Sequence, residues 1–166
     1  MRRLANQAWW TVAQAAVATV LPGLAAHAGD SCSLTTSGVA FGVYSPLSAT
    51  PATMTGTLAV NCSWTPVAPT QINLAVYFST GNSGNYTTRT MTNGTSNLNY
   101  NLYFNSNGTA VWGNGTGGSY YGVATLTTAT QTGSASANGT IYGVIAAGQD
   151  VTPGSYLDTI IVTVSF

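Results

Sequence analysis

Apolar and polar residues alternate along several short stretches of the chain, which is the period expected of β-strands with one buried face. The alternation predicts six strands, over residues 39–44, 57–62, 71–79, 97–105, 140–145 and 159–166. In the last of them four apolar side chains share one face: Ile160, Val162, Val164 and Phe166. In strand 97–105 the face with Leu98 and Tyr100 is apolar, and the face with Asn99 and Asn101 is polar.

A turn tripeptide recurs between these stretches. It has four copies: Asn93-Gly94-Thr95, Asn107-Gly108-Thr109, Asn114-Gly115-Thr116 and Asn138-Gly139-Thr140. Asn-Gly is a strong hairpin signal because both residues accept positive φ. The tripeptides also match the N-glycosylation sequon, but their position between strand-like stretches favours the turn interpretation. About seven short strands with this spacing predict an all-β fold, an immunoglobulin-like β-sandwich without helices of normal length after residue 28.

The N-terminus has the pattern of a secretory signal peptide. Arg2 and Arg3 precede an apolar stretch over 8–21, and Ala26-His27-Ala28 is a small-x-small cleavage signature. The alternative, a transmembrane anchor, needs about 20 apolar residues, and this stretch is shorter. We therefore expect residues 1–28 to be a cleaved signal peptide, leaving 29–166 as one domain with no integral membrane span.

The predicted domain is unusually poor in charge. Residues 29–166 contain no Lys, Glu or His, and the charged side chains are Asp30, Arg89, Asp150 and Asp158. Without a basic patch, nucleic acid is not an expected partner. Without histidine, the usual general base of hydrolases is missing. Asp150 and Asp158 are candidates for a glycosidase-like carboxylate pair, but they flank a Pro-Gly turn, where aspartates commonly bond to backbone amides. No catalytic residue, metal site or cofactor is expected.

Cys32 and Cys62 are the two cysteines of the chain. An even number of cysteines in an exported protein predicts a disulfide. A zinc site is the poorer interpretation, because two cysteines without a histidine cannot complete one.

Four aromatic residues lie outside the clearest strands: Trp64, Trp112, Tyr120 and Tyr121. On loops they are candidates for contact with sugars or surfaces. The alternative is that they cover the ends of the sandwich core.

Several segments together carry a resemblance to a known family. They are Cys32, Phe41-Gly42-Val43-Tyr44, the strand from Gly56 to Cys62, Arg89 with Met91, 98–103, Trp112-Gly113, Tyr142-Gly143 and the ending 154–166. Through them the chain resembles, over essentially all of 29–166, the spore coat protein U domain, the subunit family of archaic (Csu-type) chaperone–usher pili.

The resemblance implies an incomplete immunoglobulin-like sandwich that lacks its final strand. The gap would lie between the terminal strand and the segment 39–44, in a groove lined by Val39, Phe41, Ile160, Val162, Val164 and Phe166. A periplasmic chaperone would fill it first, and a strand from a neighbouring subunit would replace the chaperone at an outer-membrane usher. The implied destination is a pilus on the cell surface, with adhesion and biofilm formation as the wider role.

One feature departs from that pattern. Cleavage after Ala28 leaves Gly29-Asp30-Ser31 before Cys32, too short for a donor strand of about five residues at 3.3 Å each. A subunit that accepts a strand but donates none belongs at a fibre tip, so we expect a tip or near-terminal position. The alternative function is a freestanding secreted β-sandwich that binds carbohydrate or surfaces. An enzyme is the third and weakest hypothesis.

Overall fold

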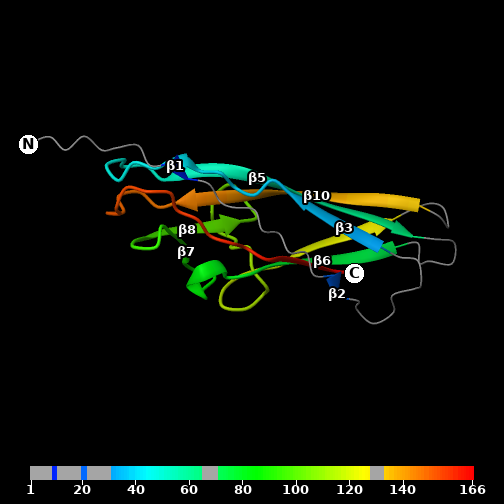
Figure 1. Ribbon diagram of the computed structural model, residues 1–166. Helices are drawn as coiled ribbons and strands as arrows, with labels where there is room; N and C mark the ends of the chain where they lie inside the picture. Colours follow the sequence, from blue (N-terminus) through cyan, green and yellow to red (C-terminus); the bar gives the residue numbers. More distant parts are fainter. Residues whose placement is uncertain (1–8, 11–19, 22–30, 65–70, 128–132) are drawn as a thin grey trace, which may run out of the picture.

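The computed structural model describes residues 9–10, 20–21, 31–64, 71–127 and 133–166. The described strands form two main sheets, ordered β3-β5-β10-β8-β7 and β2-β11-β6-β9, and a separate pair, β1-β4. Figure 1 shows the two sheets as the layers of a sandwich. The strands are β1 (Trp9–Trp10), β2 (Val20–Leu21), β3 (Ser31–Thr36), β4 (Gly42–Val43), β5 (Ala52–Trp64), β6 (Gln71–Phe78), β7 (Arg89–Thr92), β8 (Asn97–Tyr103), β9 (Gly122–Thr127), β10 (Gly133–Ile145) and β11 (Val162–Ser165). The prediction of an all-β, immunoglobulin-like sandwich is confirmed.

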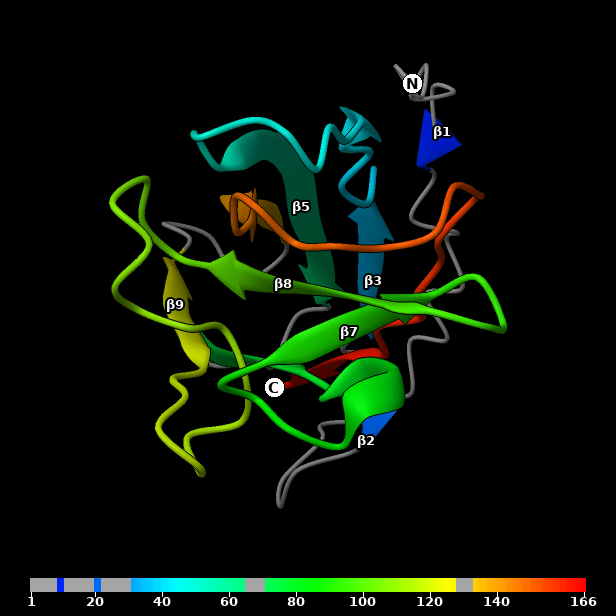
Figure 2. The ribbon, with the colours of Figure 1, turned by 90° about the vertical axis from the view of Figure 1, so that its left-hand side faces the viewer.

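Strands β5 and β10 form the long central pair of the first sheet. They run antiparallel in continuous register from Gly133 opposite Trp64 to Ile145 opposite Ala52. Strand β3 pairs with the other edge of β5, and β7 pairs with β8; Figure 2 shows both pairs side by side.

The core lies between the sheets, where the alternating apolar residues of both inner faces meet. Ile72, Leu74, Val76 and Phe78 of β6 are all buried, as the alternation of β6 predicts. Trp112 is stacked on Phe78, with ring centroids 4.4 Å apart, and on Phe104 at 4.0 Å. Burial of such large rings is a major part of the stability of a sandwich.

The predicted disulfide is present. Cys32 of β3 and Cys62 of β5 are directly opposite each other in the antiparallel register, with their Cα atoms 4.0 Å apart. The bond therefore fastens the first strand of the described domain to the centre of its sheet.

The strand pattern differs from the prediction at the start of the domain. Within residues 29–166 the first described strand is β3, and only Gly42 and Val43 of the predicted strand 39–44 are in a strand, β4. Gly38 and Gly42 have positive φ, 65° and 74°, which interrupts the extended backbone. Strands β7 and β9 were also not predicted. The terminal strand β11 is shorter than the predicted 159–166.

The four Asn-Gly tripeptides adopt two kinds of structure: three form turns and one lies within a strand. The turn prediction is confirmed at Asn93, Asn107 and Asn114, each followed by a glycine with positive φ. In all three the hydroxyl of the threonine two residues later donates to the Asn Oδ1, at 2.6–3.0 Å. It is wrong for Asn138-Gly139, which lies within β10 opposite β5. There Gly139 is opposite Leu58 of β5 and is not among the glycines with positive φ, so it belongs to the extended strand and not to a turn.

In the described part of the chain the helical structure is a single 3-10 turn, Gly81–Ser83. No helix there is long and apolar enough to cross a membrane. Most of the expected signal peptide, 1–28, lies outside the described residues; β1 and β2 fall within it.

Candidate functional site

The terminal strand β11 is the centre of the candidate site. It pairs with β6, Val162 opposite Phe78 and Val164 opposite Val76, and both valines are buried. Ile160 and Phe166 are half-buried against the same core. The apolar face expected of this strand thus points into the sandwich.

The other edge of β11 accepts a strand from a distant part of the chain. Strand β2 pairs with it in parallel, Val20 opposite Val164 and Leu21 opposite Ser165. The pairing follows from physical chemistry, because an edge strand presents unpaired backbone donors and acceptors to any extended segment that reaches it. In the structure this edge of β11 is therefore paired, over Val164 and Ser165, with a strand that lies far away in the sequence.

The segment around Val39 and Phe41 forms the other expected wall of the groove. Both side chains are buried and pack where β10 has a glycine: a Cβ on Gly143 would come within 2.6 Å of the Phe41 ring and 2.7 Å of Val39. Phe41 also makes an edge contact with Tyr100, with centroids 5.9 Å apart. Strand β4, which follows, pairs with β1. Each expected wall of the groove is thus next to a strand that pairs with a two-residue strand from the first 21 residues: β4 pairs with β1, and β11 pairs with β2.

A buried arginine on β7 connects several segments of the chain through hydrogen bonds. Arg89, on β7, is fully buried, and its guanidinium donates four hydrogen bonds to three oxygens. Nε and Nη2 donate to the Ser79 carbonyl at 3.1 and 2.8 Å, Nη1 to Asn101 Oδ1 at 2.6 Å, and Nη2 to the Trp112 carbonyl at 2.6 Å. Burial lowers the pKa of Arg89, but the planar guanidinium is matched to its acceptors and joins the residue after β6, strand β8 and the segment at Trp112.

Asn101 was expected on the polar outer face of its strand and is instead buried. Its Oδ1 accepts from Arg89, and its Nδ2 donates to the carbonyls of Tyr86 and Thr87 at 2.9 and 3.0 Å. The prediction was wrong because the alternation of apolar and polar residues gives no information about hydrogen-bond partners. A polar amide can be buried when it is hydrogen-bonded to a buried guanidinium.

Asp158 is the buried counterpart, placed just before β11. Its Oδ1 accepts from the backbone N–H groups of Asn82 and Thr159, both at 2.8 Å, and its Oδ2 from the Tyr100 hydroxyl at 2.7 Å. Burial raises the pKa of Asp158 above its ordinary value, and these three hydrogen bonds oppose the rise. Burial and the nearby carboxylate likewise raise the pKa of Tyr100. The cluster anchors the chain at the point where the terminal strand begins.

This geometry does not favour the carboxylate pair that the sequence left open. Asp158 is buried with both oxygens bonded, whereas Asp150 is exposed. A glycosidase needs both carboxyl groups facing one substrate. Among the described residues no group of three His, Cys, Asp or Glu side chains is arranged to hold a metal.

The four candidate contact aromatics divide into two pairs. Trp64 and Trp112 are buried, so for them the structure favours the alternative of a core role. Tyr120 and Tyr121 are exposed, by 59% and 44%, and Tyr121 stacks on Tyr77 with centroids 5.1 Å apart. The tryptophans are drawn inward by their large apolar area, which loop position alone does not reveal.

Comparison with known proteins identifies the family of this chain. The Spore Coat Protein U domain model matches residues 17–163. Protein U of Myxococcus xanthus is 30% identical over 167 residues, covering 93% of this chain and 88% of Protein U. These matches confirm the resemblance inferred from the sequence segments, and the family match begins within the expected signal peptide.

A crystal structure of similar fold is the CsuC–CsuE chaperone–tip adhesion subunit pre-assembly complex, from archaic chaperone-usher Csu pili of Acinetobacter baumannii. The TM-score is 0.52 and the identity 22%, over 82% of this chain and 40% of that chain. The present chain thus spans less than half the length of this structural relative, and the likeness concerns the fold. On the family match and the identity to Protein U, the chain belongs to the Spore Coat Protein U domain family.

Proposed function

We propose that this protein is a non-enzymatic structural subunit of a bacterial surface pilus, assembled by strand addition through a chaperone–usher route. The observation that carries the proposal is the terminal strand. Val162 and Val164 point into the core, while the outer edge of β11 pairs with a two-residue strand, β2, from elsewhere in the chain. An edge of this kind supplies backbone hydrogen bonds for affinity and an adjoining apolar face for selectivity.

In the proposed mechanism a periplasmic chaperone first supplies a strand beside β11. At the outer-membrane usher, a strand from a neighbouring subunit takes its place. The side chains proposed to line the groove are Val39, Phe41, Ile160, Val162, Val164 and Phe166, all of them buried or packed against the core. The similarity in fold to a tip adhesion subunit bound to its chaperone supports this route.

Finer features of the proposal concern position and export. Residues 1–28 direct export through the periplasm, and the domain 29–166 reaches the cell surface. There it has a tip or near-terminal position in a fibre that serves adhesion and biofilm formation. Tyr120 and Tyr121 are the exposed aromatics available for contact.

A periplasmic expression experiment tests the proposal. The full chain is produced with and without a co-expressed periplasmic pilus chaperone, and soluble yield and complex formation are measured. We expect a soluble subunit–chaperone complex, and degradation or aggregation of the chain alone, because β2 pairs with only two residues of the β11 edge. A soluble, cooperatively unfolding monomer obtained equally well without a chaperone would contradict it.

That contrary outcome would favour the second candidate, a freestanding secreted sandwich that binds carbohydrate or surfaces. The exposed Tyr121, stacked on Tyr77, is the observation on its side. An aromatic platform of this kind stacks on sugar rings. Binding of the soluble monomer to immobilised neutral glycans, lost in Tyr121→Ala, would support it.

A further inference from the structure

Among the described residues, the first part of β10 has one edge without a partner strand. Strand β10 pairs with β5 along its whole length, but β8 pairs only with Tyr142–Ile145. Within the described ranges, no strand pairs with the other edge of residues 133–141. This stretch is about 30 Å long at 3.3 Å per residue, long enough for a stable strand pairing.

The edge carries none of the features that natural proteins use to block edge pairing. Residues 133–140 read Gly-Ser-Ala-Ser-Ala-Asn-Gly-Thr, with no charge and no proline. Their register with β5 is continuous, so no bulge twists the edge away. Lysine, proline and bulges are the usual protections of exposed edges. A flat, uncharged edge of small residues without them is suited to pairing.

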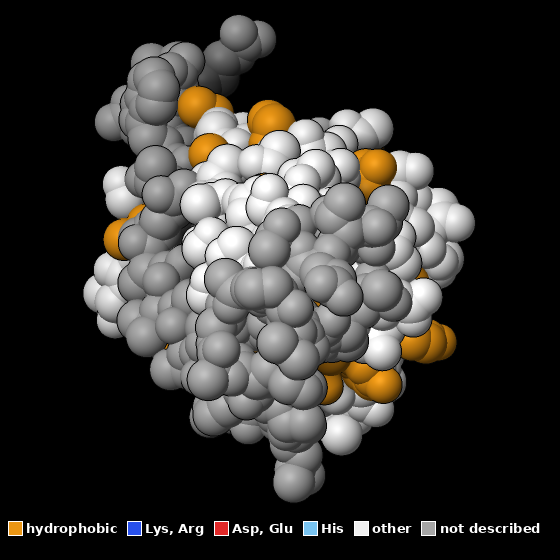
Figure 3. Space-filling model, turned by 90° about the vertical axis from the view of Figure 1, so that its right-hand side faces the viewer, with side chains coloured by type: hydrophobic (Ala, Val, Ile, Leu, Met, Phe, Trp, Pro, Cys, Tyr) orange, Lys and Arg blue, Asp and Glu red, His pale blue; other side chains and the backbone are white. Residues whose placement is uncertain are grey.

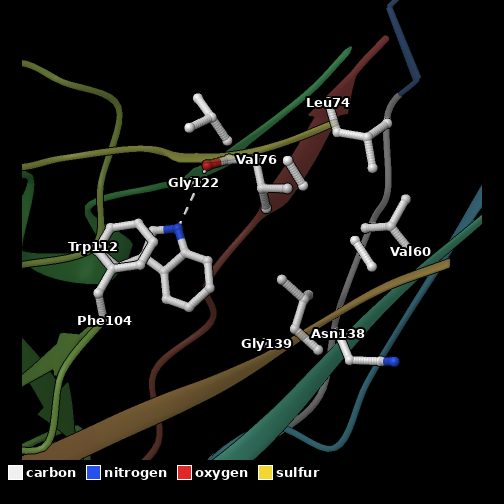
Figure 4. Close-up of a pocket in the computed structure, with 12 residues that line it drawn as sticks. Val60, Leu74, Val76, Phe104, Trp112, Gly122, Asn138 and Gly139 are labelled. Carbon is white, nitrogen blue, oxygen red and sulfur yellow. Dashed lines mark hydrogen bonds between the residues drawn. The ribbon is translucent and has the colours of Figure 1, made fainter. Parts of the chain in front are cut away.

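An apolar cavity opens beside the same edge, between β9 and β10 (Figure 4). Its volume is about 200 Å³. The wall is formed by Leu58, Val60, Leu74, Val76 and Trp112, and the facing strands contribute small residues, Gly122, Ala124, Ala137 and Gly139. These small side chains do not close the sandwich, so apolar core surface is left accessible at this side. In the second sheet, β9 and β11 flank β6 from opposite sides, so this opening is distinct from the β11 edge.

We propose that the edge of β10 over residues 133–141 pairs antiparallel with the same edge of a second copy of this chain. An edge that meets itself across a twofold axis forms a closed, isologous contact that needs no second surface. The outward side chains are Ser134, Ser136, Asn138 and Thr140, all small enough for close approach. The partner strand would also cover the mouth of the cavity and remove apolar surface from water.

The low surface charge favours a second copy of this chain as the partner of the β10 edge. Arg89 and Asp158 are buried, so the described surface has almost no charge with which to repel another copy. The face shown in Figure 3 has no charged side chain among its visible described residues. Proteins with net charge near zero are prone to self-association. In a fibre this contact is lateral and joins neighbouring fibres, because it leaves β11 free; it does not depend on the proposed strand addition at β11.

A register-matched pair of variants tests the proposal. Ser134→Lys with Ser136→Lys places two charges on the edge. Ser63→Lys with Asn61→Lys places the same charges on the β5 residues directly opposite, one strand inside the edge. All four positions are exposed, so both variants keep the core intact, which circular dichroism verifies. Like charges facing each other across paired strands oppose pairing.

The exported full chain is examined by sedimentation velocity, and assembled fibres by electron microscopy. We expect reversible dimers or bundled fibres for the wild type and the β5 variant. The β10 variant should have a dissociation constant at least ten times higher, or give separate fibres. Amides of 133–141 should also exchange hydrogen more slowly at high protein concentration. A wild-type chain without self-association, or equal losses in the two variants, would overturn the proposal. If the chain proves not to be a pilus subunit, the sedimentation measurement on the free protein still decides it.

Discussion

The Tyr100 hydroxyl donates a hydrogen bond of 2.7 Å to Asp158 Oδ2, joining β8 to a segment 58 residues further along the chain. Tyr100 is buried in the core and Asp158 lies just before β11. The bond therefore links the packing of the first sheet to the start of the strand proposed to receive a partner. Hydrogen bonds to a buried charged group are among the stronger ones.

Tyr100→Phe should lower the free energy of unfolding by ~1–3 kcal/mol, because a buried carboxylate oxygen loses its side-chain donor. Chemical denaturation of the disulfide-intact protein measures the loss. The control is Tyr142→Phe, since the Tyr142 hydroxyl makes no hydrogen bond within the described residues. Equal stability of the two variants would show that the bond contributes nothing.

The stability of the protein should fall as pH rises through the titration of Asp158. Burial raises the pKa of the folded-state carboxyl above its ordinary value of 3.8, so the folded state binds a proton more readily than the unfolded state. The contribution is fully present below pH 3.8 and is lost as pH rises through the folded-state pKa.

Unfolding free energies measured between pH 3 and 7 in the wild type and Asp158→Asn test this dependence. The sequence has three acidic side chains and one histidine, so few other groups titrate in this range. The Asn variant should lack the decline. A wild-type stability that increases with pH, relative to the variant, would contradict the expected direction.

Removing the disulfide should destabilise the domain. The bond closes a loop with a sequence separation of 30 residues, and Cys32→Ser with Cys62→Ser is expected to cost about 3–4 kcal/mol in the chain-entropy model. Denaturation midpoints of the two proteins measure the difference. A thiol assay on the native exported protein should find no free thiol; two reactive cysteines would refute the pairing.

An acidic residue on the buried face of β11 should prevent chaperone binding. Val164→Asp puts an unpaired charge into an apolar site, at a cost of several kcal/mol. Thr163→Asp is the matched control, because Thr163 is on the same strand, is only half-buried and pairs with Tyr77. Subunit levels and pull-down with the chaperone are measured in the periplasm. Normal levels and pull-down of Val164→Asp would argue against the proposed groove.

The two kinds of candidate aromatic should respond differently to truncation. Trp112→Ala removes a ring stacked between Phe78 and Phe104 and should cost about 3–5 kcal/mol. Tyr120→Ala should change stability by less than about 0.5 kcal/mol, because its side chain is exposed. If adhesion uses these tyrosines, attachment falls only in the Tyr120 and Tyr121 variants that fold normally. A stable Trp112→Ala variant would mean that the stack is not part of the core.

Local sequence patterns predicted the elements that depend only on neighbouring residues or on composition. Strand β6 was predicted because all four of its inward residues are apolar, and the turn at Asn93 because Asn-Gly accepts positive φ. The disulfide followed from an even cysteine count in an exported chain. Strand β3 was missed because its side chains are mostly small or polar and none is buried: they alternate between exposed and half-buried. Its place comes from the disulfide at Cys32 and from pairing with β5.

Four properties could be predicted from the residues alone: the strand-forming alternation, the disulfide, the absence of basic patches and the apolar face of the terminal strand. These are local or compositional properties that each residue carries wherever it lies. Three further outcomes became visible only in the packed fold: Arg89 and Asn101 are buried together, Trp112 is part of the core, and Asn138-Gly139 lies within a strand. In the part of the chain that the structure describes, packing also left one edge of β10 over residues 133–141 without a partner strand. Those outcomes depend on which distant groups meet, and a linear pattern contains no information about a partner dozens of residues away until packing brings it into contact.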